Sequence, residues 1–153
     1  MDIFEIEIKR TNSGNEDFRK LVVELEKHLT FADEKAHSEC KQYNKLETIK
    51  YVVVAYIEGK AIGCGAIRKY DSDTIEVKRM FVSIDARGQG VGTKMLLELE
   101  AWAIELGFKK SILETGNMLP EAVRLYKKSN YIQIPNYGQY EGMEKSICFA
   151  KKL

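Results

Sequence analysis

The sequence predicts an α/β fold, a mixed sheet flanked by helices, and three observations support this class. Short β-branched or alternating segments are typical of strands, longer segments with apolar residues on one face are typical of helices, and a glycine-rich loop joins a strand to the longest helix. The 153 residues match the usual size of one domain, contain only two prolines and show no repeats. We therefore expect a single domain over residues 1–153.

The N-terminal part is expected to form a strand followed by a helix. Residues 4–8 alternate apolar and charged side chains, which predicts the strand. Ser13-Gly14-Asn15-Glu16 has the pattern of a capping box, and apolar residues at helical spacing then predict a helix over 16–29. The polar stretch from Thr30 to Thr48 is predicted to hold a short helix with loops that could shape a substrate pocket.

The remaining chain supplies most of the sheet. Strands are expected at 51–57, 61–70, 74–82, 110–114, 131–134 and 146–151. A long helix beginning near Gly92 is expected to end at Gly107, because glycine favours helix C-termini. Pro120 suits the first turn of a last helix that runs to about Ser129.

Composition excludes several classes of function. Lysine plus arginine (24) nearly balances aspartate plus glutamate (23), so we expect no nucleic-acid partner. The longest apolar stretch, Tyr51 to Ile57, is far shorter than the roughly 20 residues of a membrane helix. The N-terminus lacks the basic and apolar regions of a signal peptide. A cytoplasmic protein without membrane contact is therefore expected.

The three cysteines do not indicate a metal or disulfide site. Cys40, Cys64 and Cys148 are far apart and include no C-x-x-C pair. Only His28 and His37 could join them as ligands. We expect small buried side chains and no metal.

The loop Arg87-Gly88-Gln89-Gly90-Val91-Gly92 carries the main functional signal. Three glycines remove side chains where the N–H groups that begin a helix converge, and such a junction binds anions such as a diphosphate. Arg87 would add a permanent positive charge for the same phosphates. The alternative is a flexible connection without a ligand.

Spacing excludes two other phosphate-binding loops. A Walker loop needs lysine directly after its last glycine, whereas Thr93 separates Gly92 from Lys94. A dinucleotide fingerprint needs G-x-G-x-x-G after the first strand of a βαβ unit, whereas this loop is G-x-G-x-G after the fourth strand.

Arg87, Gly90 and Gly92 match [QR]-x-x-G-x-[GA], the signature of the GNAT superfamily of N-acetyltransferases. The chain resembles bacterial members of that family over nearly its whole length, including Leu113-Glu114-Thr115-Gly116-Asn117 and the helix around Tyr126. The resemblance implies a GNAT-like, mostly antiparallel sheet of about seven strands with about four helices. It also implies acetyl-coenzyme A (acetyl-CoA) as donor, direct transfer to an amine, and a possible homodimer.

The resemblance further implies a set of coenzyme-binding residues. Backbone groups on the strand before the loop would pair with the pantetheine arm and could polarise the thioester carbonyl. Asn117 would lie near the coenzyme, with a simple turn residue as the alternative. The set comprises Met80, Phe81, Val82, Arg87, Gly88, Gln89, Gly90, Val91, Gly92, Thr93 and Asn117.

Two residues are candidates for proton transfer. Amines are mostly protonated near neutral pH, so transfer needs a base. Glu76 stands eleven residues before Arg87, the offset of the general base in histone-type members of the family; an exposed strand glutamate is the alternative. Tyr126 matches the family tyrosine that protonates the leaving thiolate, with a core aromatic as the alternative.

Other residues leave the acceptor open. Tyr137 and Tyr140 could line an acceptor pocket or cover the sheet edge. His37 is expected at the surface, and Cys148 is not expected to act as a nucleophile because no histidine lies near it in sequence. The acceptor is expected to be a small-molecule or peptide amine. A non-catalytic module that binds acyl-CoA is the alternative function.

Overall fold

The computed structural model describes residues 5–32 and 48–153, and a seven-stranded sheet forms its centre. The strands are β1 (Ile6–Thr11), β2 (Tyr51–Ile57), β3 (Lys60–Lys69), β4 (Thr74–Val82), β5 (Lys110–Gly116), β6 (Ile132–Ile134) and β7 (Ser146–Lys152). Their order in the sheet is β1-β2-β3-β4-β5-β7-β6. All neighbours are antiparallel except the parallel pair β4 and β5. The mixed, mostly antiparallel sheet of about seven strands is confirmed.

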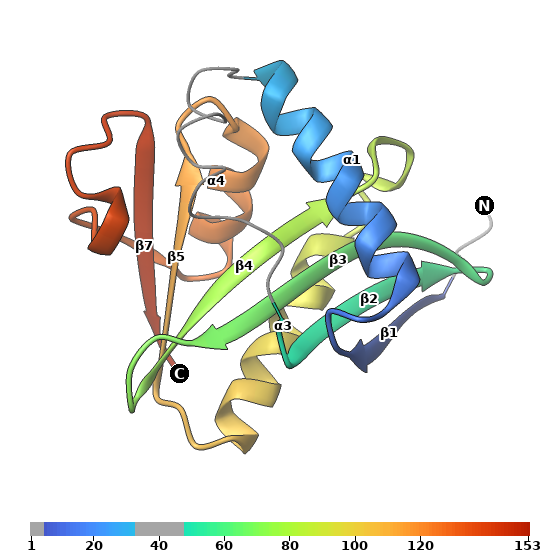
Figure 1. Ribbon diagram of the computed structural model, residues 1–153, viewed down its shortest axis with the longest axis horizontal. Helices are drawn as coiled ribbons and strands as arrows, with labels where there is room; N and C mark the ends of the chain where they lie inside the picture. Colours follow the sequence, from blue (N-terminus) through green and yellow to red (C-terminus); the bar gives the residue numbers. More distant parts are fainter. Residues whose placement is uncertain (1–4, 33–47) are drawn as a thin grey trace.

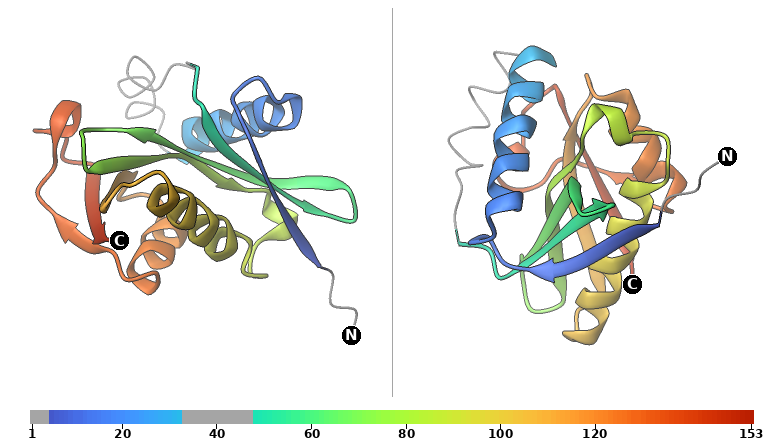
Figure 2. Two further views of the ribbon diagram at one scale, coloured as in Figure 1. Left: turned by 90° about the horizontal axis from the view of Figure 1, so that it is seen from below. Right: turned by 90° about the vertical axis from the view of Figure 1, so that its right-hand side faces the viewer.

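Helices cover both faces of the sheet (Figure 2). They are α1 (Glu16–Ala32), α3 (Val91–Glu105) and α4 (Pro120–Lys128), with short 3₁₀ turns η1 (Ile84–Ala86) and η2 (Gly138–Tyr140). α1 lies on one face, here called the front face, while α3 and α4 lie on the back face. The described residues thus hold three α-helices rather than about four. Most of the segment predicted as a further short helix, 30–48, falls outside the described residues.

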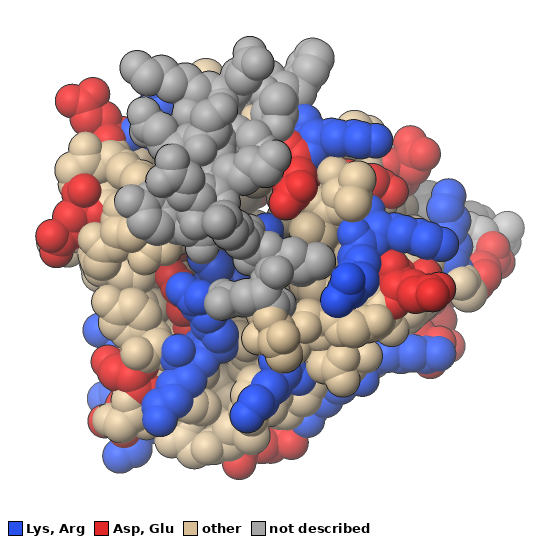
Figure 3. Space-filling view, viewed as in Figure 1, with Lys and Arg blue, Asp and Glu red and all other residues tan. Residues whose placement is uncertain are grey.

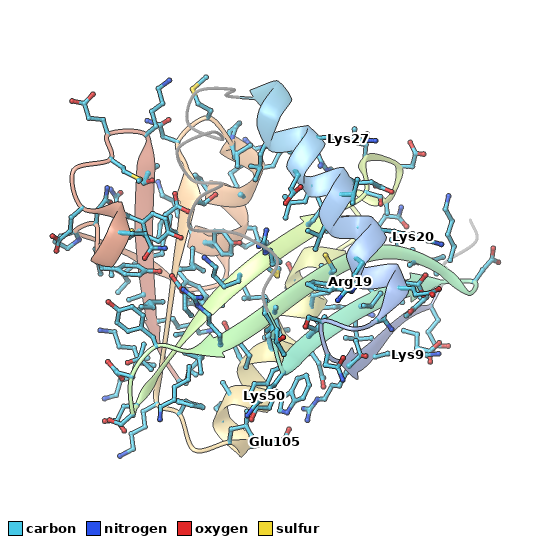
Figure 4. All side chains as sticks on the ribbon, in the orientation of Figure 1. Lys9, Arg19, Lys20, Lys27, Lys50 and Glu105 are labelled. Carbon is cyan, nitrogen blue, oxygen red and sulfur yellow. The ribbon has the colours of Figure 1, made fainter. Side chains whose placement is uncertain are left out.

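Each helix buries its apolar side against the sheet. On the front face, Phe18 and Leu21 of α1 pack against β2 and β3, while Lys20 and Lys27 project from the same helix (Figure 4). On the back face, Met95 of α3 packs into a larger apolar core. Burying one such side chain contributes roughly 1.5–3 kcal/mol, so these two layers hold the sheet in place.

The first strand and the start of the first helix differ from the prediction. The first strand is Ile6–Thr11 rather than residues 4–8. Ser13 does not cap α1: its Oγ accepts a hydrogen bond from the Ile49 N–H (2.8 Å), whereas Asn15 Oδ1 accepts from the Phe18 N–H (2.9 Å). Asn15 is therefore the residue that satisfies an N–H of the first helical turn.

A β-bulge interrupts β4 where it pairs with β3. Cys64 is opposite Phe81 and Ala66 is opposite Lys78, so the single residue Gly65 faces two residues of β4, Arg79 and Met80. Arg79 adopts a left-handed backbone (φ 60°). A Cβ on Gly65 would clash with Met80 Sδ and approach Leu99 Cδ1 to 3.1 Å, so a larger residue here would force these two side chains to move.

Candidate active site

The backbones of β4 and β5 separate in a wedge, and the region between the two strands is here called the wedge-shaped opening. The two strands pair only over Thr74–Glu76 and Lys110–Ile112, and Figure 1 shows them diverging beyond that point. One backbone edge of β4 pairs with β3. From Val77 onward, the other edge is no longer paired with β5 and lies along the opening. This stretch includes Met80, Phe81 and Val82, the segment that the sequence predicted to pair with a pantetheine arm.

The glycine loop closes one side of this region, between η1 and α3. Gly88 and Gly90 have φ of 78° and 81°, and no heavy atom lies within 4 Å of where their Cβ atoms would stand. The Lys94 N–H donates to the Gly90 carbonyl (3.0 Å) in the first turn of α3. The N–H groups of Val91 and Gly92 come earlier in the chain, so no carbonyl of the same helix accepts from them. N–H groups at the start of a helix, next to glycines without side chains, are the kind of site that can hold a diphosphate.

Arg87 has two contacts that anchor this loop. Its Nε donates to the Val82 carbonyl (2.9 Å), and one terminal nitrogen donates to Glu121 at the start of α4 (3.2 Å). The Glu121 side chain is 62% exposed, so this ion pair is weak. A phosphate could replace Glu121 without loss of a strong contact.

Close packing joins the glycine loop to α4. A Cβ on Gly92 would approach Leu125 Cδ2 to 3.1 Å, so the absence of a side chain lets the two helices meet. Tyr126, the next residue on α4, is buried with its ring centroid 5.8 Å from Tyr131 and 6.1 Å from Phe149. Burial, assisted by the charge of Glu114, raises the Tyr126 pKa, so its hydroxyl is protonated at neutral pH.

Glu76 lies on β4 at the narrow end of the opening. Its side chain is only 2% exposed. One carboxylate oxygen accepts from Arg68 Nε (3.1 Å) and the other from the Tyr137 hydroxyl (2.5 Å). Burial and the Glu76 charge raise the Tyr137 pKa. The phenol therefore stays protonated and donates a hydrogen bond to the carboxylate.

A second pair of charged residues lies next to Glu76. Lys78 Nζ donates to the Tyr140 hydroxyl (3.1 Å), and burial lowers the Lys78 pKa. Glu114 on β5 accepts from Ser146 Oγ (2.7 Å), and burial raises its pKa. Both shifts disfavour the charged form, as expected for groups that have left water.

We call Arg68, Glu76, Lys78, Glu114, Tyr137 and Tyr140 the polar cluster. Strand alternation places Glu76 and Lys78 on the same face of β4, opposite Ile75 and Val77 of the back core. Tyr137 and Tyr140, from the η2 segment, complete it and pack edge to face at 5.6 Å.

The structure brings some predicted site residues together and leaves others apart. Glu76 and the Met80–Val82 stretch share β4, whereas Tyr126 packs in the back-face core with Tyr131 and Phe149. Gln89 is exposed and Thr93 is half-buried in the first turn of α3. Asn117 is exposed in the turn after β5, where its N–H donates to the Lys145 carbonyl (2.8 Å).

Three members of the polar cluster were not singled out from the sequence. Lys78 stands two residues after Glu76, and Glu114 ends a predicted strand, so strand alternation could have placed both on the face of Glu76. Arg68 could be found only from the β3–β4 register, which sets it directly opposite Glu76. His37 and Cys40 lie outside the described residues, and Cys148 is fully buried.

Two further searches cover only residues 5–32 and 48–153. No three His, Cys, Asp or Glu side chains gather there in a way that could hold a metal ion. No helix in that part is long and apolar enough to cross a membrane.

Comparison with known proteins identifies the family. The profile of the Acetyltransferase (GNAT) family matches residues 17–131. The chain belongs to the GNAT family. An IAA acetyltransferase of Azospirillum brasilense is 34% identical over 102 residues, 66% of this chain and 67% of that protein. The uncharacterized N-acetyltransferase YjgM of Escherichia coli (strain K12) is 37% identical over 87 residues, 55% of this chain and 52% of that protein.

Solved structures of GNAT proteins have the same fold. A proposed acyl-CoA N-acyltransferase from Klebsiella pneumoniae has a TM-score of 0.79 and 26% identity, with 97% of both chains covered. A GNAT acetyltransferase from Elizabethkingia anophelis with acetyl-CoA bound has a TM-score of 0.67 at 20% identity, covering 97% of this chain and 98% of that one. GNAT proteins use acetyl-CoA to acetylate amines. The chain is thus a GNAT acetyltransferase whose acceptor the family does not specify.

Proposed function

We propose that this GNAT protein transfers the acetyl group of acetyl-CoA directly to a primary amine of a small molecule, a peptide N-terminus or a lysine. The observation that carries the proposal is the position of Glu76, a buried carboxylate at the point where β4 and β5 separate. A thioester lying along β4 would present its carbonyl close to this carboxylate.

The glycine loop and β4 hold the donor in this proposal. The diphosphate binds the N–H groups at the start of α3, and the pantetheine arm extends the sheet along the open edge of β4. One of the N–H groups of Met80, Phe81 and Val82 then donates to the thioester oxygen and stabilises the negative charge that develops there.

Glu76 is the general base. Arg68 and Tyr137 fix its two oxygens, so the side chain does not have to be ordered during reaction. The acceptor reaches it by displacing the Tyr137 hydroxyl or by passing its proton through that hydroxyl. Both routes lead from the front face, because Tyr137 lies on that side of β4.

Tyr126 is the general acid. The protonated amine gives one proton to Glu76, its nitrogen attacks the acetyl carbon, and the C–N bond forms as the C–S bond breaks. Tyr126 gives its proton to the sulfur and regains one from the attacking nitrogen. The products are an amide, a thiol and the proton left on Glu76.

Product analysis by mass spectrometry tests the proposal. Purified protein, acetyl-CoA and a panel of amines should give products heavier by one acetyl group. Glu76→Gln can still accept from Arg68, so it should fold and bind acetyl-CoA while turnover falls about 10²–10⁴-fold. Binding of acetyl-CoA without product from any amine would favour the non-catalytic acyl-CoA-binding module instead.

A further inference from the structure

Glu76, the general base proposed above, is covered on the front face of the sheet. Its side chain is 2% exposed, and both carboxylate oxygens accept a hydrogen bond, one from Arg68 and the other from the Tyr137 hydroxyl. The Tyr137 bond measures 2.5 Å, which is typical of a hydroxyl bonded to a charged acceptor. Tyr137 is partly exposed. An amine that arrives from the front face therefore meets the Tyr137 hydroxyl before it meets the carboxylate.

The Tyr137 ring is packed against two other tyrosines. Tyr70 contacts it edge to face at 5.4 Å, and Tyr140 does so at 5.6 Å. Tyr70 is 47% exposed, whereas Tyr140 is buried. Swinging the Tyr137 hydroxyl aside would lose the contacts with both rings together with the hydrogen bond to Glu76.

Hydrogen bonds also fix the backbone around Tyr137. Asn136 Nδ2 donates to the carbonyls of Tyr140 (3.2 Å) and Met143 (3.0 Å), which ties together the segment before β7. The Tyr140 N–H donates to the Tyr137 carbonyl (2.9 Å) in η2. These bonds oppose a shift of the whole segment, so we expect the hydroxyl to stay on Glu76 when an acceptor binds.

A phenol in this position can accept and donate a hydrogen bond at the same time. Its proton is directed to Glu76, while its oxygen keeps lone pairs that can accept from an ammonium. Burial and the charge of Glu76 raise the Tyr137 pKa, so the phenol does not ionise near neutral pH. Tyr137 can therefore pass its proton on only while it receives another.

The acceptor has to lose a proton inside the site. A lysine-type amine, with a pKa of ~10.4, is mostly protonated near neutral pH. Figure 3 shows acidic and basic side chains interspersed over the described part of the front face, without a large field of one sign. Such a surface does not remove the proton of an approaching ammonium, so the amine arrives charged.

We propose, resting on the N-acetyltransferase function above, that Tyr137 is a catalytic residue that relays the first proton of the acceptor ammonium to Glu76. An N–H bond of the ammonium breaks as its proton forms an O–H bond on Tyr137, and the former phenol proton moves to Glu76. Tyr137 ends as the phenol it was, Glu76 ends as the carboxylic acid, and the neutral amine has a lone pair for attack on the acetyl carbon.

Removal of one hydroxyl tests the relay. Tyr137→Phe keeps the packed ring, so it should fold and bind acetyl-CoA, while kcat at pH 7 for the best amine of the panel falls about 10²-fold or more. Tyr70→Phe makes the same change on the neighbouring ring, whose hydroxyl does not bond to Glu76, and should keep the kcat of the parent. A hydroxyl that merely covers Glu76 predicts the opposite result, because its removal would open the carboxylate to the amine. Equal or faster turnover of Tyr137→Phe therefore overturns the relay.

The pH dependence separates a relay from a packing effect. Between pH 7 and pH 9 the neutral fraction of a lysine-type amine rises roughly 100-fold, and neutral amine has no first proton to lose. The deficit of Tyr137→Phe in kcat/KM should therefore shrink over this range, and that of Glu76→Gln should shrink with it. A deficit that stays constant with pH overturns the relay.

A double variant tests whether Tyr137 and Glu76 act on one path. Glu76→Gln combined with Tyr137→Phe should be no slower than the slower single variant, because either change interrupts the same transfer. Losses that multiply overturn the relay.

The outcomes also separate the relay from the proposed function. Loss of turnover in Glu76→Gln but not in Tyr137→Phe overturns the relay and leaves Glu76 as the base. Full turnover in both variants overturns the relay and the role of Glu76, although the protein remains an N-acetyltransferase. Acetyl-CoA binding without product from any amine overturns the proposed function and the relay together.

Discussion

Replacement of Gly90 by tryptophan should abolish acetyl-CoA binding, and Gly59 offers a matched control. Both glycines have left-handed backbones, with φ of 81° and 78°, and no heavy atom lies within 4 Å of either Cβ position. A side chain in this conformation costs about 1–2 kcal/mol wherever it stands. Gly90→Trp and Gly59→Trp should therefore lose similar stability, roughly 2–8 °C in Tm for a domain of this size.

The two variants should differ in their response to the donor. Acetyl-CoA at about 100 times its Kd stabilises the native state by about 2.7 kcal/mol. That corresponds to a rise in Tm of roughly 5–11 °C at the same conversion. The indole at position 90 would occupy the space beside the N–H groups of α3, so the rise should vanish there. Position 59 lies in the β2–β3 turn, so its variant should keep the full rise.

Thermal unfolding with and without acetyl-CoA measures both effects in one experiment. The phosphate-binding role of the loop is refuted if Gly90→Trp keeps the Tm rise of the parent. A loss of the rise in Gly59→Trp as well would show that strain alone, and not the position of the side chain, prevents binding.

Three further predictions concern the site and the strands that form it. Tyr126→Phe keeps the buried ring and should lower kcat by about 10²-fold or more with little change in KM for acetyl-CoA. An unchanged kcat in steady-state kinetics would rule out Tyr126 as the general acid. Glu114 faces Glu76, Lys78 and Ser146, and its pKa is raised in the folded state. Its stability contribution is therefore complete below the ordinary pKa of 4.5 and is lost as the pH rises through the folded pKa. As the pH rises above 4.5, the Tm of Glu114→Gln should increase relative to the Tm of the parent. A Tm difference that stays constant from pH 4.5 to 8 would contradict the raised pKa of Glu114. Gly65→Ala should cost about 1–3 kcal/mol by overpacking against Met80, whereas Gly116→Ala, with its nearest contact at 3.8 Å, should be close to neutral in denaturant unfolding.

Local patterns in the sequence predicted most of the fold. The strands at 51–57 and 74–82 have the expected bounds, because both are long and β-branched. Gly107 ends the long helical segment with a left-handed backbone (φ 94°), as its position predicted. These features depend on neighbours in sequence, and a single sequence records them.

Features that depend on distant residues were missed. The N-cap of α1 is Asn15 because Ser13 is occupied by Ile49, a residue 36 positions later. The bulge in β4 sets Gly65 of β3 against Met80, a contact that no pattern within β4 reveals. Arg68 joins the candidate site only through the β3–β4 register. The sequence therefore indicated the glycine loop directly and the polar cluster only in part, since the latter is assembled from β3, β4, β5 and the η2 segment.

The order of strands also implies an order of assembly during synthesis. β7 lies between β5 and β6, although it is the last strand of the described chain to leave the ribosome. The sheet from β1 to β4 can pair as soon as Val82 is made, but β5 gains its antiparallel neighbour only when Ser146–Lys152 emerge. Domains fold as they are synthesised, N-terminal part first. The nascent chain should thus expose the unpaired backbone edge of β5 until β7 is added, and chaperones could bind this edge during that interval.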